Sequence, residues 1–192
     1  MKIIFLDHDG VICLSNNWGS RITKWKKYHK KNPNTKFEDR PLDCRLDNFD
    51  TKAIKVLNSI LEETEAEIVV SSDWRYNANL EELGDYYISQ GIIKRPIDVT
   101  GMFNELYPRE WQRLRNFANL EYERTMEIKH WLNNHPEVTH WVAVDDLDMS
   151  GKFGNILGNS NVGLTNFVIT PKQQQGIKQS GIKDKIINFL KG

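Results

Sequence analysis

Apolar residues along the chain form four short runs, and each run is typical of a buried β-strand. The runs are rich in Ile, Val, Phe and Trp, which favours strands that are buried on both faces, as in a parallel sheet covered by helices. They occupy residues 2–6, 67–70, 141–144 and 167–169. A shorter run at residues 97–99 predicts one more short strand.

Between these runs the apolar residues recur every three or four positions, which is the spacing of one helix face. The predicted helices occupy residues 51–63, 80–89, 111–118, 125–134 and 182–190. Strands that alternate with helices indicate βαβ units. We therefore expect an α/β fold with three layers, Rossmann-like, around a mainly parallel sheet.

The chain length fits one domain of this class. Its 192 residues are enough to bury a substantial core, and we expect a single domain over residues 1–192. Residues 13–50 do not fit a minimal sheet, because they are polar, basic in the middle and poor in aliphatic side chains. This segment is expected to form a small cap or an active-site loop.

Charge and composition exclude several classes of partner. The 26 basic and 26 acidic residues give no net charge, so any binding of a polyanion must be local. The two cysteines, Cys13 and Cys44, lack the spacing of a zinc site or a disulfide scaffold. No apolar stretch approaches 18 residues, and no signal peptide pattern precedes the first strand. We expect a cytoplasmic protein with no membrane partner, and infer no obligate protein partner.

Two aspartates follow directly on the first predicted strand, in the run Asp7-His8-Asp9-Gly10. Open α/β folds bind ligands at the carboxyl ends of their strands, and a turn at Gly10 can bring both carboxylates to one site. Neighbouring carboxylates repel each other, so a site with both ionised needs a cation. Mg²⁺ fits, because it binds through one or two carboxylates together with water and phosphate oxygens. An ordinary aspartate-stabilised turn is the alternative.

Small polar residues follow the strand at 67–70. Ser71 and Ser72 offer hydroxyl donors, and Arg75 offers a guanidinium suited to bidentate contact with phosphate. The alternative is a strand that ends in a helix cap, with Ser72 or Asp73 as the capping side chain.

Adjacent carboxylates, Asp145 and Asp146, follow the strand at 141–144. In a parallel sheet this strand end lies on the same edge as Asp7 and Ser71. Three strand ends thus deliver complementary groups to one place. The convergence predicts a site that handles phosphate with the help of magnesium.

The order of these motifs resembles the haloacid dehalogenase-like (HAD-like) phosphatases. Residues 7–11 resemble the first motif of that superfamily, residues 70–71 the second and residues 144–146 the fourth, over about residues 2–150 in order. Residues 72–75, Ser-Asp-Trp-Arg, are also similar to the Ser-x-Trp-Arg signature of a subgroup of small HAD proteins, some of them associated with RNA repair.

The same subgroup has a helix that reads Arg-x-x-Glu-Ile-x-x-Trp-Leu before the fourth motif, and residues 124–132 match it. The third motif of the superfamily is a lysine or an arginine. It is expected at Arg124, with Lys129 as the second candidate because it lies further into the helix. A solvated helix charge is the alternative for either residue.

The resemblance implies hydrolysis of a phosphomonoester through an aspartyl-phosphate intermediate. Asp7 would attack the phosphorus, and Asp9 would act first as the general acid and then as the general base. Ser71 and Arg124 would hold the phosphoryl oxygens. The expected ligands of Mg²⁺ are Asp7, the backbone carbonyl of Asp9, and Asp145 or Asp146.

One residue departs from the family pattern. His8 stands where an apolar residue is common, and the alternation of a strand turns it away from Asp7. We interpret His8 as a packed or partly exposed histidine rather than a catalytic one.

The substrate depends on the segment at residues 18–31, which interleaves aromatic and basic side chains. Stacking combined with charge neutralisation is how proteins hold single-stranded nucleic acid. The candidate substrate-binding residues are Trp25, Lys26, Ser72, Arg75 and Lys129. An amphipathic helix with a solvated lysine face explains the segment equally well. We expect a phosphorylated substrate that is a nucleic-acid end or a nucleotide. The alternatives are a phosphatase of small nucleotide or sugar phosphates, and a phosphate-binding or partner-binding protein without turnover.

Overall fold

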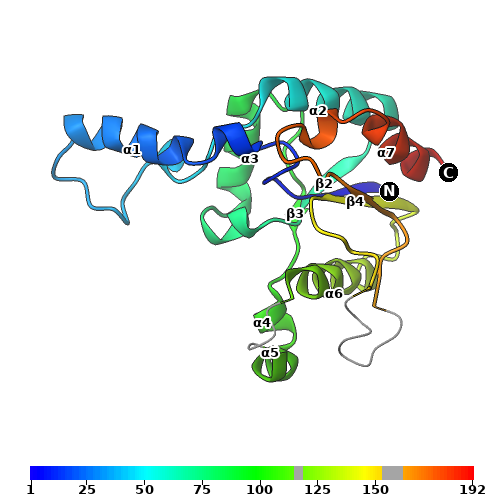
Figure 1. The fold of residues 1–192 in the computed structure, drawn as a ribbon. Helices are drawn as coiled ribbons and strands as arrows, with labels where there is room; N and C mark the ends of the chain where they lie inside the picture. Colours follow the sequence, from blue (N-terminus) through cyan, green and yellow to red (C-terminus); the bar gives the residue numbers. More distant parts are fainter. Residues whose placement is uncertain (115–118, 153–161) are drawn as a thin grey trace.

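The central element of the fold is a parallel sheet. The computed structural model describes residues 1–114, 119–152 and 162–192. Within these residues five strands lie in the order β3-β2-β1-β4-β5 (Figure 1). Their bounds are β1 (Lys2–Leu6), β2 (Glu67–Val70), β3 (Asp98–Val99), β4 (His140–Asp145) and β5 (Phe167–Ile169). Every neighbouring pair is parallel, which confirms the predicted sheet.

The strand register brings three strand ends side by side. Leu6, the last residue of β1, pairs with Val70 of β2 and with Val144 of β4. Asp7 and Ser71 therefore continue their strands at equivalent positions on the carboxyl edge of the sheet.

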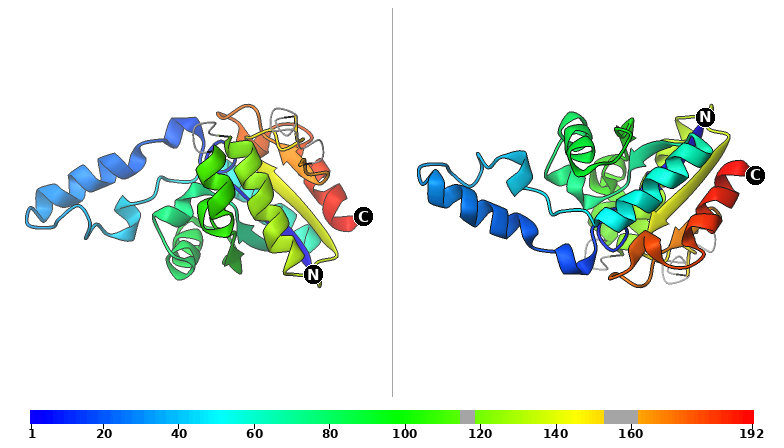
Figure 2. Two further views of the ribbon diagram at one scale, coloured as in Figure 1. Left: turned by 90° about the horizontal axis from the view of Figure 1, so that it is seen from below. Right: turned by 90° about the horizontal axis from the view of Figure 1, so that it is seen from above.

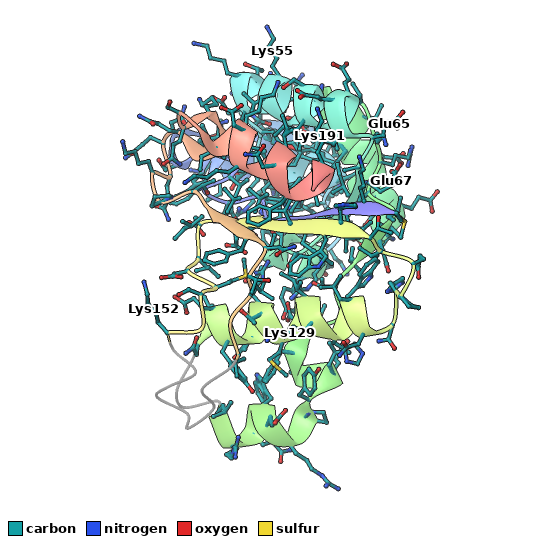
Figure 3. All side chains as sticks on the ribbon, turned by 90° about the vertical axis from the view of Figure 1, so that its right-hand side faces the viewer. Lys55, Glu65, Glu67, Lys129, Lys152 and Lys191 are labelled. Atoms are coloured by element: carbon teal, nitrogen blue, oxygen red, sulfur yellow. The ribbon has the colours of Figure 1, made fainter. Side chains whose placement is uncertain are left out.

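Helices cover both faces of the sheet, which gives the three layers that the sequence predicts (Figures 2 and 3). Successive strand side chains point to opposite faces. Ile4 and Leu6 belong to the larger core cluster, together with residues of α2 (Thr51–Thr64), α3 (Leu80–Gln90) and α7 (Ile182–Lys191). Ile3 and Phe5 belong to the second cluster, together with residues of α6 (Leu120–Asn133). The short helices α4 (Phe103–Leu106) and α5 (Pro108–Leu114) lie beyond α6.

Two predicted helices differ from the observed ones. Helix α6 begins at Leu120 rather than near Thr125, because the side chain of Asn119 accepts a hydrogen bond from the backbone N–H of Tyr122 at 2.9 Å and caps the helix earlier. Arg124 is consequently a helical residue. Of the helix expected at 111–118, only the part up to Leu114 is described, and residues 115–118 lie outside the described residues.

The middle of the polar segment at 13–50 forms an arm, whereas residues at its two ends, among them Cys13, Leu46 and Phe49, are buried in the larger core cluster. The main element of the arm is helix α1 (Ser20–Lys31), which projects away from the layers around the sheet in all three ribbon views (Figures 1 and 2). The helix has no buried residue. We use the name arm for residues 19–41, which comprise α1 and the chain that returns from its end.

Candidate active site

Three carboxylates gather at the carboxyl edge of the sheet. Asp7 follows β1, Asp145 ends β4 and Asp146 comes next. One carboxylate oxygen from each lies within 4.8 Å of the others. Asp7 and Asp145 are buried and Asp146 is half-buried, and all three line a hollow of about 180 Å³. Gln173 donates a hydrogen bond to Asp146 at 2.7 Å and fixes its carboxylate.

These carboxylates fit the donor set of a magnesium ion. Burial raises the pKa of Asp7 well above its usual range, Asp145 raises it further, and Arg124 opposes the shift. Burial likewise raises the pKa of Asp145, again against Arg124. One guanidinium among three acidic groups leaves an excess of negative charge that a divalent cation would neutralise. Carboxylate oxygens are the ligands that Mg²⁺ prefers.

Arg124 brings a fixed positive charge into the hollow. Its Nη1 lies 3.4 Å from Oδ1 of Asp7 and 3.9 Å from Oδ2 of Asp145. Its Nη2 donates to Asp73 at 3.0 Å. Burial lowers the pKa of Arg124, but the surrounding carboxylates, Asp145 first, raise it above its ordinary value. Arg124 therefore stays cationic next to the two acids at the strand ends.

Ser71 supplies a hydroxyl at the neighbouring strand end. It is buried, and its backbone N–H donates to Leu6 at 3.0 Å, which continues the sheet ladder. Its Oγ has no hydrogen-bond partner among the residues that the structure describes. A buried hydroxyl without a partner is costly, so a hydrogen bond to a bound ligand would stabilise it, although Ser71 is not among the residues that line the hollow at Asp7.

The carboxylate of Asp9 lies apart from the three clustered acids. Its Oδ2 accepts a hydrogen bond from Nε1 of Trp74 at 2.9 Å. Burial raises the pKa of Asp9, whereas hydrogen bonds from Trp74 and Cys13 lower it. The raised pKa suits a group that gives a proton to a leaving oxygen. The Asp9 carboxylate is not part of the clustered group of acids.

Asp9 also borders a second hollow. This hollow has a volume of about 360 Å³ and lies at the root of the arm. It is lined by Asp9, Trp18, Gly19, Arg21 and Asp47. The Asp9 carboxylate thus stands between the site of the clustered acids and the arm.

His8 is packed in the core, away from the clustered acids. Its Nε2 is 2.5 Å from the hydroxyl of Tyr87, and its ring lies against Phe49 and Trp74. Burial lowers the pKa of His8 to about 3, so the ring is neutral at physiological pH. These contacts agree with a packing role.

Two of the expected substrate-binding residues have structural partners instead. The Oγ of Ser72 accepts from the backbone N–H of Trp74 at 3.5 Å and caps the short 3₁₀ turn at Asp73–Tyr76, which is the capping alternative. Arg75 donates from Nη1 to Thr100 at 2.7 Å and from Nη2 to both carboxylate oxygens of Glu127, at 2.8 and 2.7 Å. Neither side chain lines the hollow at Asp7.

The other three candidates also lie away from that hollow. Lys129 is on α6 (Figure 3), is half-buried, and its pKa is lowered by burial. Trp25 and Lys26 are on α1, where Trp25 stacks on His29 with a centroid distance of 4.9 Å and Lys26 is exposed. Of the two candidates for the third motif, Arg124 is the one that contacts Asp7.

Sequence reasoning missed the roles of Trp74 and Glu127. Glu127 is buried, accepts from the backbone N–H of Phe103 at 2.9 Å and lies 3.8 Å from Nε of Arg124. It therefore joins Arg75 of one motif to Arg124 of the other. Both residues belong to the two motifs that the sequence shows, Ser-x-Trp-Arg and Arg-x-x-Glu. The Trp of the first motif holds Asp9, and the Glu of the second supports Arg124.

The fold and the site define the class of the chain. A parallel Rossmann-like sheet with an Asp-x-Asp run after its central strand, and with Ser71, Arg124 and two aspartates at the same edge, is the arrangement of a HAD-like hydrolase. The family described as the HAD domain in Swiss Army Knife RNA repair proteins matches residues 3–180, and the chain belongs to this family.

Comparisons with curated proteins and with solved structures gave no match. Within the described residues, none of the helices has both the length and the apolar character needed to cross a bilayer.

Proposed function

We propose that the chain is a magnesium-dependent phosphomonoester hydrolase that works through an aspartyl-phosphate on Asp7. The observation that carries the proposal is the position of the Asp7 carboxylate, at the end of the central strand, beside the Arg124 guanidinium and the Asp145 and Asp146 carboxylates. A nucleophile in this position has a cation beside it for the phosphoryl oxygens and acidic neighbours that can share a metal.

Asp7, Asp145 and Asp146 would hold Mg²⁺, with the backbone carbonyl of Asp9 as a further ligand that the family resemblance implies. When bound, the ion neutralises the clustered carboxylates and the charge of the phosphoryl group.

In the first step an oxygen of Asp7 forms a bond to phosphorus while the bond from phosphorus to the leaving oxygen breaks. Asp9, whose pKa burial raises, gives a proton to that oxygen. In the second step Asp9 removes a proton from water. The water oxygen bonds to phosphorus, the Asp7–phosphorus linkage breaks, and inorganic phosphate leaves.

Ser71 and Arg124 hold the phosphoryl oxygens during both steps. Preorganised donors are most effective where charge is redistributed in a buried site, because they need no reorganisation during the reaction. Trp74 holds the Asp9 carboxylate at 2.9 Å, and Glu127 supports the Arg124 guanidinium.

The substrate class is a phosphorylated nucleic-acid end or nucleotide. The family description, which names RNA repair proteins, supports this class. The alternative is a phosphatase of small nucleotide or sugar phosphates that uses the same residues.

The test compares Mg²⁺-dependent phosphate release from mononucleotides, sugar phosphates and oligonucleotides with a 3′- or 5′-phosphate. Asp7→Asn is expected to lower turnover by about 10³-fold or more while the fold is retained. Asp148→Asn is the matched control, because it makes the same change on a nearby loop where the carboxylate pairs with Lys152 at 3.2 Å. Unchanged turnover in Asp7→Asn would exclude Asp7 as the nucleophile, and equal slow rates on all substrates would exclude a nucleic-acid preference.

A further inference from the structure

Positive charge is concentrated in the arm. Residues 19–41 hold eight Lys or Arg and two Asp or Glu, a net charge of +6, although the whole chain has a net charge of zero. The rest of the chain therefore has a net charge of −6. A basic projection on an acidic body gives a local field that attracts a polyanion to the arm alone.

The outer lysines of α1 are not used to hold the arm together. Among the residues that the structure describes, the side-chain bonds from α1 to the body come from its first residues. Ser20 and Arg21 bind Asp47, and Lys24 binds Asp43, Asn48 and Tyr86. Four further lysines of the helix are exposed, and they make no ion pair among the residues that the structure describes. These are Lys26, Lys27, Lys30 and Lys31.

Aromatic rings lie next to these lysines. Trp25 stacks on His29, and its edge meets Phe37 on the returning chain with a centroid distance of 6.2 Å. A hollow of about 360 Å³ beside the arm is lined by Lys24, Lys27, Tyr28 and Lys31 of the helix and by Pro41, Asp43 and Cys44. Lysines interleaved with ring faces suit the alternating phosphates and bases of a nucleic-acid strand.

The root of the arm lies next to Asp9 of the candidate active site. The hollow at the root is lined by Trp18 and Arg21 together with Asp9. Trp18 is 43% exposed although it is a large apolar residue, and its Nε1 donates to the backbone carbonyl of Cys13 at 3.2 Å, which fixes its ring. An oriented, exposed indole beside the general acid is suited to stack on the nucleoside that bears the scissile phosphate.

We propose that the arm binds one strand of a nucleic acid whose terminal phosphate enters the hollow at Asp7. The arm lysines neutralise the strand's phosphates, and Trp18 stacks on its last base. The proposal rests on the proposed function in one respect, namely that the bound strand is the substrate of the Asp7 site. Binding of a strand would explain why α1 projects from the body. Core packing does not explain it, since no residue of the helix is buried.

The test compares two triple variants of the full chain that remove the same charge. The arm variant replaces three arm lysines by glutamine, namely Lys27, Lys30 and Lys31. The control variant replaces three exposed lysines of the body, namely Lys52, Lys55 and Lys185, of which Lys55 is labelled on α2 (Figure 3). Fluorescence anisotropy gives the dissociation constant of a labelled single-stranded oligonucleotide from 50 to 200 mM salt.

Each phosphate contact on a single strand contributes about −0.7 to the slope of log affinity against log salt. Loss of three contacts therefore reduces the slope by about 2, so the wild type should weaken about 20-fold more than the arm variant across this range. The control variant should keep the wild-type slope. Equal slopes in all three proteins would overturn the proposal.

Turnover of p-nitrophenyl phosphate separates this proposal from the proposed function, because that substrate has no strand. The arm variant should hydrolyse it at the wild-type rate while it loses kcat/KM on a phosphorylated oligonucleotide. An unchanged oligonucleotide rate would refute the role of the arm even if phosphatase activity is present. If the arm variant instead lost binding only to vesicles of anionic lipid, the partner assigned here would be wrong.

Discussion

Asp146 is the least buried of the three clustered carboxylates, and its replacement by asparagine removes charge while it keeps the shape. The carbonyl oxygen of Asn can still accept the hydrogen bond that Gln173 donates at 2.7 Å. Two unit charges separated by 4.8 Å, the limit within which these oxygens lie, repel by about 3 kcal/mol at an effective dielectric constant of 20. Solvent screening of a half-buried group reduces this to about 1–2 kcal/mol. Asp146→Asn should therefore raise the free energy of unfolding by that amount in EDTA.

Magnesium should reverse the order of stability. A ligand that binds only the folded state, at 100 times its dissociation constant, adds about 2.7 kcal/mol to the free energy of unfolding. The wild type should gain this increment, and Asp146→Asn should gain much less because one ligand has lost its charge. The variant is then the more stable protein in EDTA and the less stable one in Mg²⁺.

Urea denaturation followed by tryptophan fluorescence, with EDTA and with MgCl₂ at pH 8, measures both increments. Asp148→Asn is the control, because its carboxylate accepts from the backbone N–H of Ser150 at 3.0 Å and lies outside the clustered group. It should lose a little stability in both buffers and keep the full magnesium increment. A loss of stability in EDTA for Asp146→Asn, or an unchanged magnesium increment, would refute the reasoning.

Three further predictions concern residues around the site. Because burial lowers the pKa of His8 to about 3 from an ordinary 6.5, the unfolded chain binds a proton between these values and the folded chain does not. The free energy of unfolding of the wild type should thus fall, relative to His8→Leu, by about 1.4 kcal/mol per pH unit from pH 6 to pH 4, and parallel urea-derived profiles would contradict this. Trp74→Phe removes the donor that lowers the pKa of Asp9, so the alkaline limb of the kcat profile should move to higher pH, and an unmoved limb would show that the contact has no effect. Glu127→Gln leaves the buried Arg75 guanidinium without its counter-charge and should cost about 3–5 kcal/mol in urea denaturation. A cost below about 1 kcal/mol, the size of an exposed pair, would count against this role.

The strands and their convergence could be predicted because their signals are local. Each buried run is short, apolar and followed at once by its polar residues, so the edge that collects Asp7, Ser71 and Asp145 follows from parallel pairing alone. A helix in the arm was likewise one of the two interpretations of residues 18–31, on the basis of its amphipathic pattern.

Helix α6 shows why the rest was harder to predict. Its buried face includes Arg124, Thr125 and Glu127 beside Ile128 and Trp131, so polar side chains interrupt the apolar period and hide the first turns of the helix. These polar residues are buried because they belong to the site. Arg124 lies beside the carboxylate of Asp7, and Glu127 lies beside the guanidinium groups of Arg75 and Arg124.

Contacts between distant segments could not be predicted from the sequence. Arg75 was expected at the phosphate because its guanidinium suits that ligand, yet a carboxylate 52 residues away along the chain binds it instead. The hydrogen bond from Trp74 to Asp9 spans 65 residues and depends on how the turn after β2 packs on the turn after β1.

The most direct test of the mechanism is detection of the phosphoryl group on Asp7. The substrate is p-nitrophenyl phosphate with Mg²⁺, quenched with acid during turnover and mapped by peptide mass spectrometry. Asp9→Asn is the informative variant, because nitrophenolate leaves without a general acid whereas hydrolysis of the intermediate requires the base. The account predicts a phosphoryl adduct on the peptide that contains residue 7, and it should accumulate in Asp9→Asn. An adduct on another residue, or turnover by Asp7→Asn at the wild-type rate, would contradict it.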